Sequence, residues 1–523
     1  MRVRVLYKGY ELDFPSYPGE QEILLAFERF ERAVRSCMHG QGTSPIPRAM
    51  PGEELPVSFI QEALWLQEQL HPGSAAYNLP AAVRLSGDLD VVALERSLTE
   101  VVRRHESLRT RFPLVNGRLI QVVTPPQPLT LSSVDFSHLD SEMREIAVAD
   151  AAGREAGEAF NLEEGPLLRC KLLKVSADEH IILLTIHHIV FDAWSAGILV
   201  RELATHYATY STGGVPGLPE LPLQYGDFAK WQREQLNGER LRSMLDYWKE
   251  HLAGAPHFLQ VPTDFPRPQR LAPEGNRHFF HLTPELTASL KLLAGQEGVT
   301  LFTLLLATFQ VLLMKYSRQD DVVVGIPVAG RVRPELENLI GCFINTLALR
   351  SRVKPQSCFR EFLHVVQDAV YRMFSFQELP FEKVIQTLAP ERHPGYTPIY
   401  QVLFDFVNNP PAPVQLPSLT LSPVAANSQS TKMDLVVDMW ATDAELAGQI
   451  EYRTSLFQSD TIKLLARSFQ VLLENVVANP GVRVADLEIR TEVERQQELV
   501  ATTRQQKLNP LKIASIRPKA IKL

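Results

Sequence analysis

A short apolar run in the middle of the chain predicts a buried strand, and two adjacent histidines follow it. The run covers residues 180–186, is rich in β-branched residues and is bounded by polar ones. His187 and His188 follow directly, Asp192 comes four residues later, and helical sequence begins at Trp194. A strand therefore delivers two histidines and a carboxylate to the start of a helix. Because histidine titrates near neutral pH, proton transfer is expected here.

The length and composition of the chain indicate a soluble protein with more than one lobe. A chain of 523 residues is too long for one hydrophobic core. Its 45% hydrophobic and 22% charged residues are ordinary for a globular protein. No apolar run is long enough to span a membrane, and no signal peptide is evident, so we expect a cytoplasmic protein. The net charge of −7 argues against nucleic-acid binding.

The cysteines and the missing nucleotide motifs exclude several classes of protein. The four cysteines are far apart in the sequence, at positions 37, 170, 342 and 358. This spacing favours a reducing compartment and gives neither a disulfide framework nor a zinc cluster. The sequence has no GxxxxGK[ST] loop and no GxGxxG fingerprint, so chemistry on ATP or on a dinucleotide is not expected.

The sequence divides into four parts. Residues 1–45 begin with two alternating stretches that predict a β-hairpin, followed by a helix over residues 20–38. After a linker rich in Gly, Ser and Pro, a first lobe is predicted over residues 52–212 and a second over residues 225–489. Residues 490–523 are polar and then basic, as in a linker or tail.

Helices and strands alternate within both lobes. Further helices are predicted at residues 55–70, 91–106, 225–252, 301–316 and 460–477. Further strands are predicted at residues 78–85, 108–113, 117–124, 167–175, 321–327, 400–407, 434–440 and 446–452. Mixed elements with separated groups of strands predict an α/β protein with two sheet-plus-helix lobes.

Seven stretches resemble, in order, the motifs of condensation domains from non-ribosomal peptide synthetases and hybrid polyketide–peptide synthetases. These domains belong to the chloramphenicol acetyltransferase-like superfamily. The resemblance covers about residues 55–489, and an HHxxxD motif alone would be a weak match, whereas seven motifs in family order are specific. The stretches are Ser58–Trp65, Arg104–Phe112, His187–Ser195, Tyr225–Gln232, Ile340–Thr346, Phe376–Glu382 and Tyr396–Gln401.

The resemblance implies a fold and an activity. The fold is two chloramphenicol acetyltransferase-like lobes in a V-shaped pseudo-dimer, here preceded by the hairpin and helix unit. The HHxxxD motif lies at the junction, where two tunnels admit the phosphopantetheine arms of a donor and an acceptor carrier protein. The enzyme is an acyltransferase that transfers an acyl or peptidyl group to an aminoacyl acceptor, forming an amide or sometimes an ester. No metal and no cofactor of its own are implied, because the carriers supply the pantetheine.

The resemblance also assigns roles to the residues of the motif. His188 is the reactive histidine, acting as a base or by positioning the amine. His187 packs or forms hydrogen bonds. Asp192 is expected to pair with an arginine, because a buried carboxylate would otherwise be costly. The candidate partners are Arg104 and Arg109 in the second motif, with Arg331 as a third.

Two residues depart from the family pattern. Ala193 replaces the usual glycine after the aspartate. Alanine keeps a backbone N–H for the oxyanion, as does Trp194, but it adds strain if the position needs a positive φ. Ala63 stands where many members carry arginine. The first motif therefore resembles variants that follow polyketide synthase modules, which predicts a polyketide-type acyl donor.

Two other functions remain open at this stage. The first is a catalytically silent condensation-like platform that recruits partners, for which Ala193 leaves room. The second is a freestanding acyltransferase that uses coenzyme A thioesters or a soluble nucleophile. In the family reading the partners are donor and acceptor carrier proteins, with residues 1–45 docking an upstream synthetase subunit. We expect a monomer that binds neither nucleic acid nor membranes.

Overall fold

The computed structural model describes two stretches of the chain. These are the backbone of residues 3–7 and 10–14, and residues 45–490 except 51, 216, 273, 392, 408–415, 417, 425–430 and 443–444. Strands β1 (Val3–Tyr7) and β2 (Tyr10–Phe14) pair antiparallel, which confirms the predicted hairpin. The helix predicted over residues 20–38 and the tail beyond residue 490 lie outside the described residues.

The first lobe is built on a five-stranded sheet in the order β15-β4-β10-β9-β8. The central strand β10 (Glu179–His187) is the apolar run that precedes the histidine pair, and it is antiparallel to both neighbours. Most of its residues are buried because it lies in the middle of the sheet. The other strands are β4 (Asn78–Gly87), β8 (Ser132–Asp135), β9 (Leu168–Lys174) and β15 (Leu419–Pro423).

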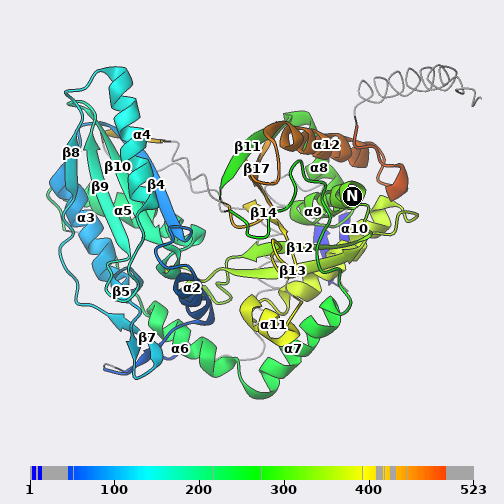
Figure 1. The fold of residues 1–523 in the computed structure, drawn as a ribbon, viewed down its shortest axis with the longest axis horizontal. Helices are drawn as coiled ribbons and strands as arrows, with labels where there is room; N and C mark the ends of the chain where they lie inside the picture. The colour runs from blue at the N-terminus through cyan, green and yellow to red at the C-terminus, as the bar shows by residue number, and fades with distance from the viewer. Residues whose placement is uncertain are drawn as a thin grey trace, which may run out of the picture.

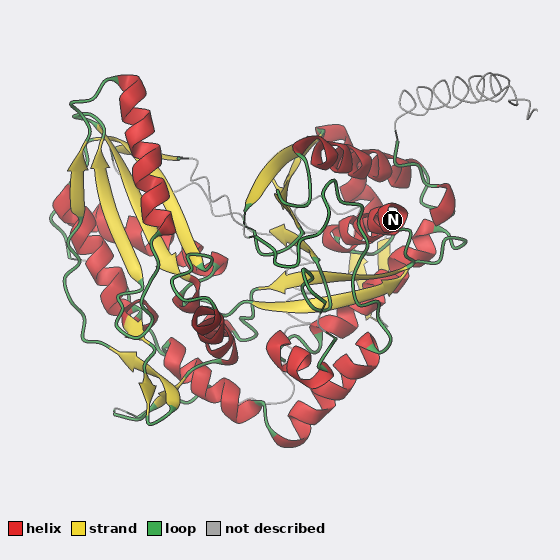
Figure 2. Ribbon diagram, in the orientation of Figure 1, coloured by secondary structure: helices red, strands yellow, loops and turns green. Residues whose placement is uncertain are grey.

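Helices cover this sheet, as Figure 2 shows in red against yellow strands. Helices α3 (Val91–Arg104) and α5 (Ala193–Tyr210) pack against each other, and α4 (Ser141–Gly157) packs on β4 and β10. Beside the sheet, α2 (Phe59–Leu70) accompanies a set of short strands. These are β3 (Leu55–Pro56), β5 (Thr110–Arg111), β6 (Leu114–Val115) and β7 (Arg118–Val123).

The second lobe contains a six-stranded sheet in the order β11-β17-β16-β14-β12-β13. The pairs β14–β16 and β12–β14 are parallel, and the others are antiparallel. The strands are β11 (Gly275–Leu282), β12 (Asp321–Val328), β13 (Asn345–Arg352), β14 (Val402–Val407), β16 (Leu435–Ala441) and β17 (Leu446–Arg453).

The helices of the second lobe enclose its core. Helix α9 (Leu301–Ser317) lies at the centre, and most of its residues are buried. Helices α8 (Pro284–Gln296), α10 (Phe359–Phe374) and α12 (Ser459–Ala478) pack against it. Among the described residues, no single helix is long and apolar enough to cross a membrane, and only α8 and α9 together pass the same test, as a pair bent by 104°.

Three further helices lie where the lobes meet. Figure 1 shows the lobes diverging as a V from the region of α6 (Tyr225–Gln235), α7 (Gly238–Leu252) and α11 (Phe381–Leu388). The prediction of one long helix over residues 225–252 was wrong. The chain breaks after α6, and Gly238 restarts it with φ +54°, a conformation that favours glycine.

One strand from late in the chain belongs to the first lobe. Strand β15 pairs antiparallel with β4, from Leu419 opposite Gly87 to Pro423 opposite Val83. The chain then returns to the second lobe as β16. The assignment of residues 225–489 to a separate lobe did not include this exchange, which ties the lobes together by backbone hydrogen bonds.

Candidate active site at the lobe junction

The end of β10 places the two histidines at the junction. His187 is the last residue of the strand, and a single 3-10 turn, His188–Val190, follows. Asp192 is the N-cap of α5, and its Oδ1 accepts a hydrogen bond from the Ser195 N–H at 2.8 Å. The predicted order of strand, histidine pair, carboxylate and helix is therefore what the structure contains.

The hydrogen bonds of His188 define which nitrogen can accept a proton. Its Nδ1 lies 2.8 Å from the carbonyl oxygen of Phe191, so Nδ1 carries the hydrogen and donates it. Nε2 is then the nitrogen with a free lone pair. Burial, and after it the charge of Lys432, lowers the pKa of His188 to about 4. The imidazole is therefore neutral at pH 7, with the lone pair of Nε2 unprotonated.

His187 has a different environment from its neighbour. The side chain is 1% exposed, and its ring packs against the rings of Tyr77 and Phe160 at centroid distances of 6.4 and 6.0 Å. Its Nδ1 accepts a hydrogen bond from the Ile189 N–H at 3.1 Å. Burial lowers the pKa of His187 to about 3. This residue packs and shapes the turn, in agreement with the role expected for it.

Asp192 forms a buried ion pair with Arg331. The guanidinium donates to both carboxylate oxygens, at 2.9 and 3.1 Å, and the arginine and aspartate side chains are 1% and 3% exposed. The Phe343 N–H donates to the same carboxylate at 3.0 Å. Arg331 and Phe343 come from the second lobe, so Asp192 joins the lobes beside the histidines and is not positioned to meet a substrate.

The other two arginine candidates were wrong. Arg104 is buried, but it pairs with Glu202 on α5 and donates to the Pro219 carbonyl at 2.8 Å. Arg109 donates to the Thr124 carbonyl and lies 3.5 Å from Glu106 on its own turn. Both arginines hold the first lobe together. Proximity in sequence to the motif favoured them, whereas the partner of Asp192 is 139 residues away.

The replacement of glycine by Ala193 causes no backbone strain. Ala193 is the first residue of α5 and is not among the described residues with positive φ. Its side chain is exposed, as is that of Trp194, whose indole N–H donates to the Glu337 carbonyl at 2.9 Å. The alternative in which alanine disturbs the loop is therefore not realised here. A role for the two backbone N–H groups with an oxyanion stays a prediction.

The Ile340–Thr346 motif of the second lobe, called the docking segment below, packs against α6 and the first lobe. The Tyr225 hydroxyl donates to the Cys342 carbonyl at 2.5 Å, and the Ser58 hydroxyl lies 2.8 Å from the tyrosine oxygen. A side chain on Gly341 would collide with the Tyr225 ring, at 2.0 Å from a Cβ. The Cys342 sulfur is 3.7 Å from Nδ1 of His188, so this contact reaches the histidine directly.

A pocket opens at the same junction. It is lined by residues of α2, α6, the docking segment and the turn before α11, including Ile60, Trp231, Cys342 and Glu382. Burial raises the pKa of Glu382, and its Oε2 has no hydrogen-bond partner among the described residues. Cys342 lines this pocket and also contacts Nδ1 of His188, so the pocket lies one side chain away from the histidine.

Sequence reasoning missed two parts of the site. Ser195 links Asp192, Arg331 and the Gly341 backbone through its hydroxyl, which was visible only as the last residue of a motif. Lys432 comes from the segment before β16 and lies 4.2 Å from the centroid of the Tyr77 ring. In the sequence it is a single lysine before an apolar strand, a pattern that is usual at surfaces.

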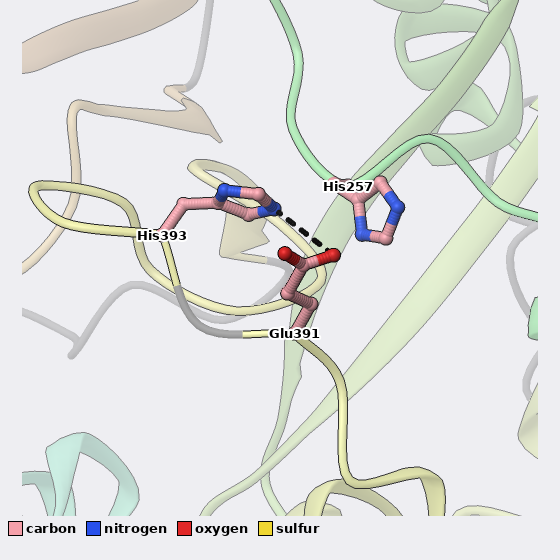
Figure 3. A group of neighbouring side chains, drawn as sticks. All are labelled: His257, Glu391 and His393. Carbon is pink, nitrogen blue, oxygen red and sulfur yellow. Dashed lines mark ion pairs between the residues drawn. The ribbon is translucent and has the colours of Figure 1, made fainter.

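One group of side chains in the described part of the chain could hold a metal ion. The ligand atoms of His257, Glu391 and His393 lie within 4.8 Å of one another, and Figure 3 shows them gathered on two loops. His257 and Glu391 are exposed. The group shares no residue with the histidine pair. The expectation that the reaction uses no metal stays a prediction.

Comparison with known proteins identifies the family. The condensation-domain family model matches residues 52–499. The chain belongs to the condensation-domain family. Condensation domains are acyltransferases that form amide bonds, and the seven motifs, the two-lobed fold and the histidine pair agree with this assignment.

The relatives and solved structures place the chain among peptide synthetases. Chondramide synthase of Chondromyces crocatus is 40% identical over 465 residues, which are 88% of this chain and 12% of that protein. The chain thus spans a small part of that relative. The X-domain in a complex with OxyB from teicoplanin biosynthesis is 29% identical with a TM-score of 0.77, covering 86% of this chain and 99% of the other.

A third similarity is to a protein solved with a small molecule. SgcC5 of Streptomyces globisporus, in complex with a naphthyl ethanediol and sucrose, is 26% identical with a TM-score of 0.67. The match covers 82% of this chain and 100% of that one. The similarity thus covers most of this chain and the whole of the other one.

Proposed function

We propose that this chain joins a carrier-bound acyl or peptidyl thioester to a carrier-bound aminoacyl group and forms an amide. The observation that carries the proposal is His188, held neutral at the junction with its Nε2 lone pair free. The buried Asp192–Arg331 pair fixes the turn that carries it. The pantetheine arms would come from the carriers, and we place the reaction in the cytoplasm, where their thiols stay reduced.

The chemistry follows from the position of His188. The acceptor arrives as an ammonium, which must lose a proton before its nitrogen attacks the thioester carbonyl. Nε2 of His188 can accept that proton, and it can also orient the amine. After attack the nitrogen carries a second surplus proton, which it also loses, and collapse of the tetrahedral intermediate forms the amide and expels the pantetheine thiolate. Of the two protons released, one passes to solvent and the other protonates the thiolate.

An assay with two loaded carriers tests this function. We expect transfer from an acyl-loaded donor carrier to a leucyl-loaded acceptor carrier, and loss of that transfer in His188→Ala. The same assay with octanoyl coenzyme A and free leucine is the control. Turnover with the soluble substrates alone would instead establish a freestanding acyltransferase.

The similarity to an X-domain bound to OxyB favours one alternative, a platform that recruits another protein without chemistry. The structure of this chain retains both histidines and the Asp192–Arg331 pair at the junction. A platform would need neither a free Nε2 nor the buried ion pair that holds the turn carrying it. Absence of any transfer between loaded carriers would support the platform and contradict condensation.

We also propose that the donor is a polyketide-type acyl group without an α-amino group. Ala63 on α2 supports this, because it removes the arginine that many members carry in the first motif. In a competition on the same upstream carrier, an octanoyl donor is expected to react at least several times faster than an alanyl donor. Ala63→Arg should reduce that preference. A faster alanyl reaction in the unchanged chain would contradict the proposal.

Residues 1–45 are proposed to dock an upstream subunit. The hairpin β1–β2 supports this, because a two-stranded sheet offers its edges to another chain. Deleting residues 1–45 should lower turnover with the natural upstream protein at low concentration, because docking raises the effective concentration of the donor carrier. Turnover at a saturating donor concentration should stay normal. Equal losses under both conditions would show that the segment stabilises the first lobe instead.

A further inference from the structure

Lys432 is a cation beside the active site without a counter-ion. Its Nζ lies on the face of the Tyr77 ring, and across the described residues no ion pair or hydrogen bond to Nζ is found. The Tyr77 carbonyl accepts a hydrogen bond from the His188 N–H at 2.8 Å. Lys432 comes from the second lobe, so its ammonium reaches across the junction to the side chain of Tyr77, whose backbone binds the reactive histidine.

The groups that face Lys432 do not neutralise it. The two histidines of the motif are neutral, and burial raises the pKa of the Cys342 thiol, so that it stays protonated. The carboxylate of Glu451 on β17 also acts on the lysine, but it is held by Arg277 at 3.0 Å. An aromatic face contributes only a modest attraction for a cation. The junction therefore has an uncompensated positive charge.

The position of Lys432 is fixed by its neighbours in the chain. Asp434, two residues later, forms a two-pronged ion pair with Arg267 at 3.1 and 2.5 Å. Thr431 packs closely on Gly275 of β11. Lys432 is an exposed residue, but its Nζ lies against the Tyr77 ring of the first lobe. Lys432 is therefore held at the junction by its chain neighbours and is not part of either hydrophobic core.

The N-terminus of α5 carries a partial positive charge that already has an anionic partner, whereas Lys432 has none among the described residues. The Asp192 carboxylate accepts hydrogen bonds from the Ser195 N–H, the Phe343 N–H and the Arg331 guanidinium. That carboxylate offsets the partial positive charge of the helix N-terminus. Among the described residues at the junction, Lys432 is thus a cation left available to negative charge that develops during the reaction.

We propose that Lys432 binds the carbonyl oxygen of the donor thioester and stabilises the oxyanion of the tetrahedral intermediate. The inference rests on the proposed condensation reaction. The acceptor nitrogen forms the C–N bond with its lone pair, and the carbonyl π electrons move onto the oxygen that Lys432 binds. Those electrons then re-form the C=O bond while the C–S bond breaks. The first proton of the ammonium passes through His188 to solvent, and the second, lost by the nitrogen of the intermediate, passes to the thiolate.

Three variants assayed with loaded carriers test this inference. Lys432→Met is expected to lower kcat about 100-fold, as the loss of an oxyanion donor does in other enzymes, with unchanged melting temperature and carrier binding. Lys432→Arg should retain most activity because it keeps the charge. Lys383→Ala is the matched control, because Lys383 also lies over a ring, that of Phe59 at 4.8 Å across α11 and α2.

The pH profile separates this role from a structural one. Desolvation of the ammonium between the lobes lowers the pKa of Lys432 to about 8, so the wild-type rate should fall as the pH rises through that value. Arginine stays protonated, so Lys432→Arg should remove the fall. Deprotonation of the acceptor amine changes the rate in the opposite direction, because it raises the rate as the pH rises.

Three results would overturn the inference. The first is a Lys432→Met rate within about threefold of wild type, the second is an equal loss in Lys383→Ala, and the third is a Lys432→Arg rate that still falls at alkaline pH. Wild-type inactivity would instead contradict the condensation function itself.

Discussion

Replacing His188 with alanine is expected to lower kcat for transfer between loaded carriers by at least about 100-fold. General acid–base groups contribute about 100- to 10,000-fold to rates, and Nε2 of His188 is the free basic nitrogen at the junction. The substitution removes one hydrogen bond to the Phe191 carbonyl, so the fold should persist. Single-turnover transfer of a radiolabelled acyl group measures the effect.

His187→Asn is the matched control for this variant. The asparagine oxygen can accept the Ile189 N–H in place of Nδ1 of His187. We therefore expect a loss of less than about tenfold in kcat, because the ring of His187 is buried and faces Tyr77 and Phe160 rather than the pocket. A loss as large as that of His188→Ala would reverse the roles of the two histidines. Full activity in His188→Ala would remove it from the mechanism.

The sequence predicted those features of the site that depend on neighbouring residues in the chain. An apolar run with polar boundaries gave β10, and the order of the motif placed both histidines and the N-cap Asp192 close to its end. These relations depend on the periodicity of a strand and on helix capping, which operate over a few residues. The same is true of the strands β12, β14, β16 and β17, each found within two residues of its predicted start.

The predictions that were wrong concern residues whose partners are set by tertiary contacts. Arg104 lies in the second motif, but Glu202 and the Pro219 carbonyl compete for its guanidinium. Arg331 reaches Asp192 because the segment after β12 folds back across the junction. Strand β15 joins the first lobe through pairing with β4, and nothing in its own short sequence indicates which sheet it enters.

The prediction of one helix where the structure has α6 and α7 was wrong for a different reason. The amphipathic pattern continues from residue 225 to residue 252, and the charged residues favour helix throughout. Asn237 and Gly238 are weak helix formers, and the glycine adopts a positive φ that permits a change in direction. The periodicity thus predicted helical residues on both sides of the break but missed the turn after which α7 packs beside α11.

Replacing Asp192 with alanine is expected to destabilise the protein by roughly 3–5 kcal/mol and to reduce activity as well. Arg331 would be left 1% exposed without its counter-ion, while Ser195 and Phe343 would lose an acceptor. Chemical denaturation followed by fluorescence measures the change. The second lobe would also lose an anchor beside the histidines, so the junction that positions His188 should loosen.

A second ion pair provides the control for this prediction. Arg154 and Asp150 on α4 lie 2.9 Å apart but are 71% and 57% exposed, so Asp150→Ala should leave the free energy of unfolding nearly unchanged. In the double variant Asp192→Asn with Arg331→Met, stability should recover in part, because no unpaired charge remains buried. Activity should not recover, since the link between the lobes is still missing. An Asp192→Ala protein as stable as wild type but inactive would show that the carboxylate acts in the chemistry, and not through the ion pair with Arg331.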